Sequence, residues 1–157
     1  MTIQIDTREH KFELARIQRQ IERRGVKTFL QKLDVGDYMN VDNPKLIIDR
    51  KQDLQEVVSN ITHQHSRFQR ELIRAMKSDV QLILLIEHGP DIQSLEDVWF
   101  WENPRLEKSP KATTGEKLYK AMVTMQKEYG IRYEFCTKRE TGERIVELLG
   151  ANDGKER

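Results

Sequence analysis

Acidic and basic side chains gather in the stretch VGDYMNVDNPKLIIDRKQDL, residues 35–54. Asp37 follows a glycine at a predicted tight turn, and Asp49 and Lys51 stand at the end of the apolar run KLIID. Side chains two residues apart on a strand share a face, so Asp49 and Lys51 are expected to point the same way. Asp6 ends a further predicted strand, TIQI. The sequence therefore predicts three carboxylates and one ammonium at a common rim.

Such a group has a defined chemistry. Converging carboxylates repel one another unless a proton or a cation lies between them. Mg²⁺ takes oxygen ligands of this kind, with Mn²⁺ as an expected substitute, and it can bind a phosphate oxygen and lower the pKa of a bound water. A lysine adds positive charge where a phosphoryl transition state is negative. Asp6, Asp37 and Asp49 are thus predicted metal ligands and Lys51 a catalytic residue for phosphodiester hydrolysis. On spacing alone, a turn cap and a solvated strand end explain the residues equally well.

A second group of charges lies in HSRFQRELIRAMK, where Arg67, Arg70 and Arg74 recur at helical spacing. A row of guanidinium groups that faces one way suits phosphate binding. The alternative is a solvated basic face partly paired with Glu71.

Other polar and aromatic residues have two interpretations each. His63 and His65 lack the further ligands of a zinc site, so His65 either contacts phosphate or is a plain surface residue. Glu87 either points into the site or pairs with an arginine. The aromatic run Trp99–Trp101 either stacks on unpaired bases or folds onto the core or a subunit interface.

The elements that would position these residues alternate along the chain. Residues 27–50 are predicted to form a β-hairpin, and VQLILLIE is apolar enough for a central strand covered on both faces. Helices are predicted over residues 12–24, across about 53–78, after residue 113 and at the end of the chain. This pattern indicates a mixed α/β domain.

Composition limits the setting. The 157 residues suffice for one domain, predicted over 1–150, followed by a flexible polar tail at 151–157. The formal net charge is only +1, so any nucleic-acid affinity must come from a local basic patch. We expect neither a signal peptide nor a membrane span. The single cysteine, Cys136, excludes an internal disulfide and fits a reducing cytoplasm.

Four motifs, IDTRE, VGDY, IIDRK and LILLIE, occur in the order and approximate spacing of the XPF-type (ERCC4-domain) nucleases. These form a branch of the PD-(D/E)XK, restriction-endonuclease-like superfamily. The signature of the family is GD, a spacer and ERKxxxD, which the chain resembles with Gly36-Asp37 and then Asp49-Arg50-Lys51. The resemblance implies an α/β fold with a restriction-endonuclease-like core, in which helices flank a central mixed sheet.

The resemblance also implies roles for single residues. Asp37 corresponds to a metal-binding aspartate, Asp49 replaces the usual glutamate with a shorter side chain, and Lys51 corresponds to the catalytic lysine. Asp6 corresponds to an acidic residue at the end of the first strand. Arg8, in the first motif, is a predicted substrate contact.

Further positions of the signature are less regular. Arg50 is assigned to substrate binding, with the alternative that it holds a neighbouring carboxylate. Arg67 corresponds to an arginine near the active site. The trailing aspartate of the signature would fall at Gln55, and Asp53 or Glu56 is expected to replace it.

The resemblance implies a metal-dependent, structure-selective endonuclease that cuts branched DNA, such as a Holliday junction, flap or fork. We expect a short phage or prophage form that serves recombination or repair in the bacterial or phage-infected cytoplasm. It would act as a homodimer or with an unidentified DNA-binding partner. The alternatives are a catalytically silent DNA-binding scaffold and a sequence-specific restriction-type endonuclease.

Overall fold

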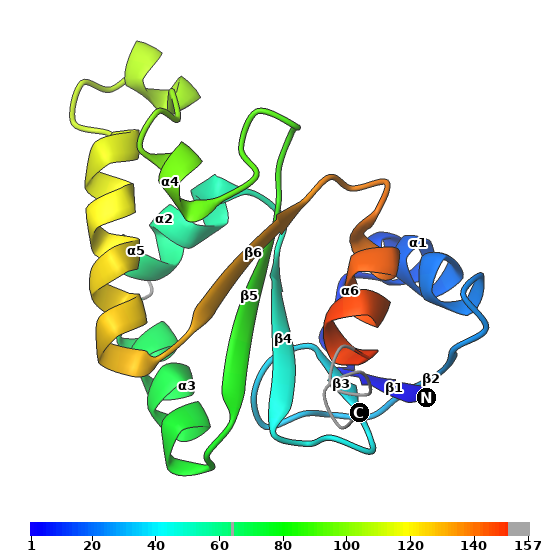
Figure 1. Cartoon of the computed structure of the whole chain (residues 1–157). Coiled ribbons are helices and arrows are strands. Elements are labelled where there is room, and N and C mark those ends of the chain that lie inside the picture. The colour runs from blue at the N-terminus through cyan, green and yellow to red at the C-terminus, as the bar shows by residue number, and fades with distance from the viewer. Residues whose placement is uncertain (64, 151–157) are drawn as a thin grey trace.

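The computed structural model describes residues 1–63 and 65–150, so the predicted tail at 151–157 lies outside the described residues. A single sheet runs through the molecule with helices on both faces (Figure 1). The strands are β1 (Thr2–Ile5), β2 (Lys27–Leu30), β3 (Tyr38–Asn40), β4 (Leu46–Lys51), β5 (Gln81–Glu87) and β6 (Arg132–Cys136). The helices are α1 (Lys11–Glu22), α2 (Leu54–Thr62), α3 (His65–Lys77), α4 (Leu95–Val98), the 3₁₀ helix η1 (Pro104–Glu107), α5 (Gly115–Tyr129) and α6 (Thr141–Gly150).

The strand order in the sheet is β2-β1-β3-β4-β5-β6. β3 runs antiparallel to both β1 and β4, whereas β1 pairs with β2, and β4, β5 and β6 pair with one another, in parallel. The predicted hairpin over residues 27–50 is therefore wrong in its first strand, because β2 pairs with β1 and the short β3 is the partner of β4. Only three residues form β3, too few to show an alternating pattern.

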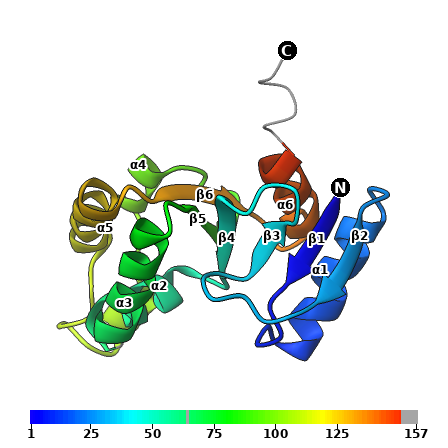
Figure 2. The same cartoon turned by 90° about the horizontal axis from the view of Figure 1, so that it is seen from below.

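Two helical layers cover the sheet. α1 and α6 lie on one face, and α2, α3, α4 and α5 lie on the other (Figures 1 and 2). In the central strands, Ile48 and Leu85 enter the core under α1 and α6, while Ile47 and Leu84 enter the core under the other helices. The apolar run of β5 is thus buried from both sides, which confirms it as a central strand.

The same alternation directs the charged end of β4. Asp49 and Lys51 continue the Ile47 face toward α2 and α3, whereas Arg50 continues the Ile48 face toward α1. All three residues are at least 94% buried. The charged side chains at the end of β4 therefore point alternately into the two helical layers on either side of the sheet.

The helix α3 is amphipathic. Phe68, Leu72 and Ala75 pack into the core beneath it, so Arg67 and Arg74 lie on the sides that remain exposed. Among the helices of the described part, none combines the length and the apolar character needed to cross a bilayer.

Candidate active site

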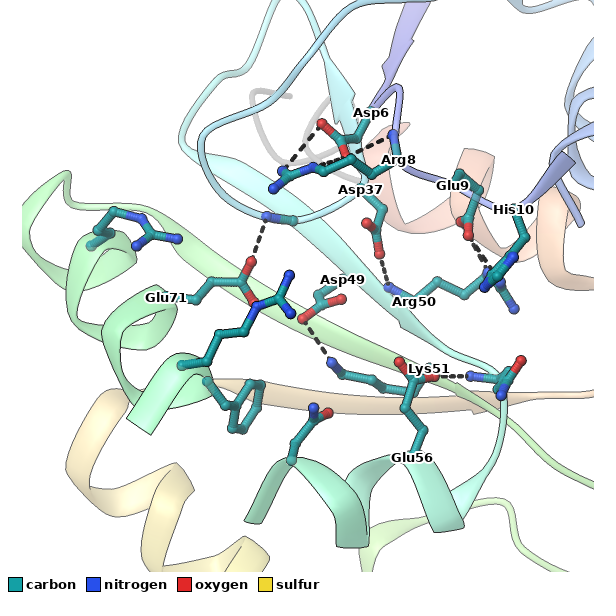
Figure 3. Close-up of a pocket in the computed structure, with 16 residues that line it drawn as sticks. Asp6, Arg8, Glu9, His10, Asp37, Asp49, Arg50, Lys51, Glu56 and Glu71 are labelled. Atoms are coloured by element: carbon teal, nitrogen blue, oxygen red, sulfur yellow. Dashed lines mark hydrogen bonds and ion pairs between the residues drawn. The ribbon is translucent and has the colours of Figure 1, made fainter. Parts of the chain in front are cut away.

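A pocket opens where the end of β4 meets the loop after β1, the turn before β3, and the helices α2 and α3 (Figure 3). It contains Asp37, Asp49 and Lys51, the three residues on which the predicted chemistry depends. Segments separated by tens of residues therefore meet at one rim.

Asp49 and Lys51 form the floor of the pocket. Lys51 Nζ lies 3.2 Å from Asp49 Oδ2, and the two side chains are only 6% and 8% exposed. The ammonium also lies 4.9 Å from the centre of the Phe68 ring. Burial lowers the pKa of Lys51, but Asp49 and other nearby carboxylates outweigh this effect and raise that pKa above its usual value. Lys51 is therefore a cation at neutral pH.

Asp37 is positioned by the turn that precedes β3. Its N–H donates to the Ile48 carbonyl oxygen at 2.8 Å, and its Oδ2 accepts from the Arg50 N–H at 2.8 Å. Gly36 has a φ of +69°, and a Cβ there would lie 2.6 Å from Ile47 Cγ2. Only glycine fits this turn, because any side chain would collide with β4 in a backbone conformation that L residues rarely adopt.

Glu71 joins the two aspartates from α3. Its Oε2 accepts a 3.4 Å hydrogen bond from the Gly36 N–H, and its carboxyl group lies near enough to Asp49 for the two to affect each other's charge. Desolvation and the charge of Asp49 raise the pKa of Glu71 to about 7, and the same two causes raise the pKa of Asp37 well above its usual value. The carboxylates thus repel one another as the sequence predicted, although the third of them is Glu71.

The donors fit a hard divalent cation. Asp49 Oδ2 is buried and accepts no hydrogen bond within the described part of the chain, although the Lys51 ammonium lies beside it. Within residues 1–63 and 65–150, no three acidic, histidine or cysteine side chains gather in a ready-made metal cage. Mg²⁺ commonly uses one or two carboxylates and completes its shell with water, so Asp37 and Asp49 would hold it here.

Asp6 is occupied by other partners. Its Oδ2 accepts from Arg8 Nε at 2.7 Å, and its Oδ1 accepts from the Leu33 N–H at 2.7 Å. Burial alone would raise the pKa of Asp6, but these hydrogen bonds lower it. These contacts favour a role for Asp6 in fixing Arg8 over its predicted role as a metal ligand, since its oxygens are already shared between a guanidinium and an amide.

For Arg50, the contacts favour the alternative to substrate binding, because carboxylates of the protein already bind its side chain. Arg50 Nε and Nη2 donate to the two Glu9 oxygens at 3.0 Å each, and Nη1 donates to Glu87 Oε1 at 2.8 Å. Arg16 binds the other Glu87 oxygen at 2.9 Å. Arg50 therefore holds neighbouring carboxylates beneath α1, and Glu87 is a partner for arginines on the face opposite Lys51.

Of the residues predicted to contact phosphate, some line this pocket and others lie outside it. Arg8, Arg67 and Arg74 line the pocket beside the carboxylates. Arg70 is exposed on α3, but the described pocket wall does not include it. His65 lines a different groove, between α3 and α5, so its predicted substrate contact is not part of this site.

Three neighbouring residues at the start of α2 are candidates for the position of the trailing acid in the signature. Gln55 lies outside the pocket lining and its side chain contacts Asn103. Asp53 caps α2 by accepting from the Glu56 N–H at 2.8 Å. Glu56 lines the pocket, where burial raises its pKa and Lys51 partly counters this. Glu56 is thus the acid that this turn of α2 presents to Lys51.

With this geometry established, the chain can be compared with known proteins. The sequence pattern of the ERCC4 domain matches residues 5–148. The chain belongs to the ERCC4 domain family.

Solved structures agree with this assignment at the level of the fold. XPF from Aeropyrum pernix is 22% identical with a TM-score of 0.67, and the match covers 100% of this chain and 64% of that one. XPF from Aeropyrum pernix in complex with DNA is 22% identical with a TM-score of 0.68, and the match covers 98% and 66%. This ERCC4 domain thus spans less than two thirds of those chains. No curated protein has a matching sequence. The predicted α/β fold, with helices flanking a mixed sheet, is confirmed.

Glu71 is the site residue of this ERCC4 domain that the sequence interpretation missed. It was considered only as a partner for surface arginines. A signal was present, since Arg67, Glu71 and Arg74 are spaced four and three residues apart and so lie on one helical stripe. An acid that lies on the same helical stripe as two predicted phosphate-binding arginines is expected to face the same pocket as they do.

The aromatic run of the ERCC4 domain follows α4. Trp101 is 9% exposed and belongs to the core, and Trp99 packs edge-on against Tyr119 at 5.5 Å between ring centres. Phe100 is 78% exposed. Two of the three rings thus pack within the domain, as expected of a loop folded onto the core.

Proposed function

We propose that this ERCC4 domain is a metal-dependent DNA endonuclease that hydrolyses phosphodiester bonds. The observation that carries the proposal is the convergence of Asp37, Asp49 and Lys51 in one pocket whose rim holds Arg67 and Arg74. Acids that bind a cation, an amine that stays charged and guanidinium groups for phosphate are the parts that phosphodiester hydrolysis requires.

The residues have separate tasks in this mechanism. Bound Mg²⁺ or Mn²⁺ would polarise a phosphate oxygen and lower the pKa of a bound water. Asp37 and Asp49 would hold that ion. Lys51, charged and held beside Asp49, stabilises the negative charge that develops on the phosphoryl oxygens. Arg67 and Arg74 bind neighbouring phosphates and so set the position of the scissile bond.

The proposed substrate is branched DNA, such as a Holliday junction, flap or fork. Membership of the ERCC4 family supports this choice, and so does the relative from Aeropyrum pernix that is described in complex with DNA. A second copy or a partner protein is proposed to complete the grip on DNA. A phage or prophage role in recombination or repair, in the cytoplasm, belongs to the same proposal.

The test is cleavage of labelled junction, flap, fork and plain duplex DNA of matched sequence with Mg²⁺, Mn²⁺ or EDTA. We expect cutting of branched substrates only when metal is present. Cleavage in EDTA would contradict the mechanism, and equal cutting of plain duplex would contradict the preference for branches. Binding without cleavage under every metal condition would favour a silent scaffold.

A further inference from the structure

A second groove continues the active-site pocket along α3. It lies between the loop of residues 31–37 and the C-terminal half of α3, and it shares Arg8 and Arg74 with the pocket. Lys32 and Lys77 complete its basic lining, against which only Asp34 supplies a negative charge. Four cations therefore line this groove in a chain whose net charge is only +1.

Three of the four cations of this groove are available to a ligand, and the fourth, Arg8, is paired with Asp6 through one edge of its guanidinium. Lys32, Arg74 and Lys77 are exposed and make no ion pair with the described residues. By contrast, carboxylates of the protein already bind Arg16 and Arg50. Unpaired cations that face one groove favour an anionic partner.

Arg8 lies where the pocket meets the groove, and hydrogen bonds fix one edge of its guanidinium group. Its Nε and Nη2 are committed to Asp6 and to the Leu33 carbonyl oxygen, at 2.7 and 2.9 Å. Its Nη1 donates to no acceptor in the described part of the chain, and the side chain is 55% exposed. Since the guanidinium is fixed on one edge and open on the other, it can bind a phosphate with little further loss of side-chain entropy.

We propose that this groove, lined by Arg8, Lys32, Arg74 and Lys77, binds the sugar–phosphate backbone of the DNA strand that passes through the active site. The proposal rests on the proposed function, because it adds a path for the strand beyond the scissile phosphate. Lysine and arginine side chains at exposed positions contact phosphates and carry no sequence information. The groove therefore adds affinity and fixes the register of the strand while leaving base sequence unread.

The first experiment measures the salt dependence of binding to a labelled junction by fluorescence anisotropy in EDTA. It compares the wild type with Lys32→Ala/Lys77→Ala and with a control, Lys117→Ala/Lys127→Ala, which removes two exposed lysines from α5. Each lost phosphate contact should reduce the slope of log K against log salt by about 0.9 on duplex DNA. We expect a slope shallower by about 2 and binding weaker by about tenfold at 0.1 M salt for the groove variant, with the control unchanged.

The second experiment locates the contact. Single methylphosphonate linkages, which remove one phosphate charge, are placed at successive positions on either side of the cut in the cleaved strand. We expect wild-type binding to weaken at one or two positions on one side only, and we expect the groove variant to lose this sensitivity. Identical slopes and identical interference patterns for groove variant and wild type would overturn the inference and leave the proposed function intact. A wild-type protein that binds none of the DNAs would overturn both.

Discussion

The backbone N–H of Arg50 donates to Asp37 Oδ2 at 2.8 Å, while the Arg50 side chain binds Glu9 and Glu87 on the opposite face of the sheet. The residue between Asp49 and Lys51 thus orients the third member of the site through its main chain. Its side chain anchors the strand to the loop before α1 and to β5. The tripeptide Asp49-Arg50-Lys51 therefore supplies two side chains to the site on one face of the sheet and an ion-pairing arginine to the other face.

Loss of the Lys51 ammonium should separate binding from catalysis. We expect Lys51→Met, which keeps most of the side-chain volume, to bind branched DNA within a few-fold of wild type and to cleave it about 10²- to 10³-fold more slowly. The reason is that the charge acts on the transition state, whereas exposed arginines contribute the binding. Single-turnover cleavage and anisotropy measure the two effects, with Lys127→Ala as the matched control. Near-normal cutting by Lys51→Met would remove Lys51 from the mechanism.

Metal binding should depend on Asp49 and not on Asp6. A cation present at 100 times its Kd stabilises a protein by about 2.7 kcal/mol, so Mn²⁺ should raise the Tm of the wild type relative to EDTA. Asp49→Asn should abolish this rise, because it neutralises a proposed ligand. Asp6→Asn should retain it, because the Asp6 oxygens already bind Arg8 and Leu33. A rise that is lost in Asp6→Asn and kept in Asp49→Asn would reverse the assignment.

Without metal, Glu71 should make stability depend on pH. Its pKa in the folded chain is about 7, against an ordinary value of 4.5. The unfolded chain therefore releases the Glu71 proton at lower pH than the folded chain, and Glu71 lowers stability progressively from about pH 4.5 to 7. We expect Glu71→Gln to equal or approach wild type at pH 4.5 and to exceed it by about 3 kcal/mol at pH 8.

Urea unfolding in EDTA at several pH values measures this difference. Glu107→Gln, which alters an exposed acid in η1, should follow the wild type throughout. An advantage of Glu71→Gln that grows as the pH falls would show that Glu71 is ionised and favourably paired in the folded protein.

Arg50 and Arg67, which both line the pocket, should differ in what they support. Arg50→Ala leaves the buried Glu9 without its ion-pair partner and leaves Glu87 with Arg16 alone. Breaking a buried pair in this way costs about 3–5 kcal/mol of unfolding free energy. Arg67→Ala, at an exposed position, should change stability by less than about 0.5 kcal/mol and weaken DNA binding instead. Chemical denaturation and anisotropy on both variants test this division. A stable Arg50→Ala with weakened DNA binding would restore Arg50 as a substrate contact.

The sequence by itself determined those features that depend on local spacing. The period of two along a strand placed Asp49 and Lys51 on one face, and the glycine before Asp37 marked a tight turn. The apolar run of β5 indicated a central strand, and the ordered motifs indicated the family. The first three of these signals are each contained within a few consecutive residues, and the fourth depends on the order of four short motifs along the chain.

Only the tertiary structure decided which of the charged residues meet. Asp6 binds the Leu33 amide and Glu71 binds the Gly36 amide, contacts that depend on how distant segments pack and that no local period encodes. The pairing of β2 with β1 was likewise settled by packing, since β2 is mostly exposed and its short pattern fits more than one neighbour. A carboxylate takes the nearest available donor, so the choice between binding a cation and binding an arginine was made when the sheet and helices came together.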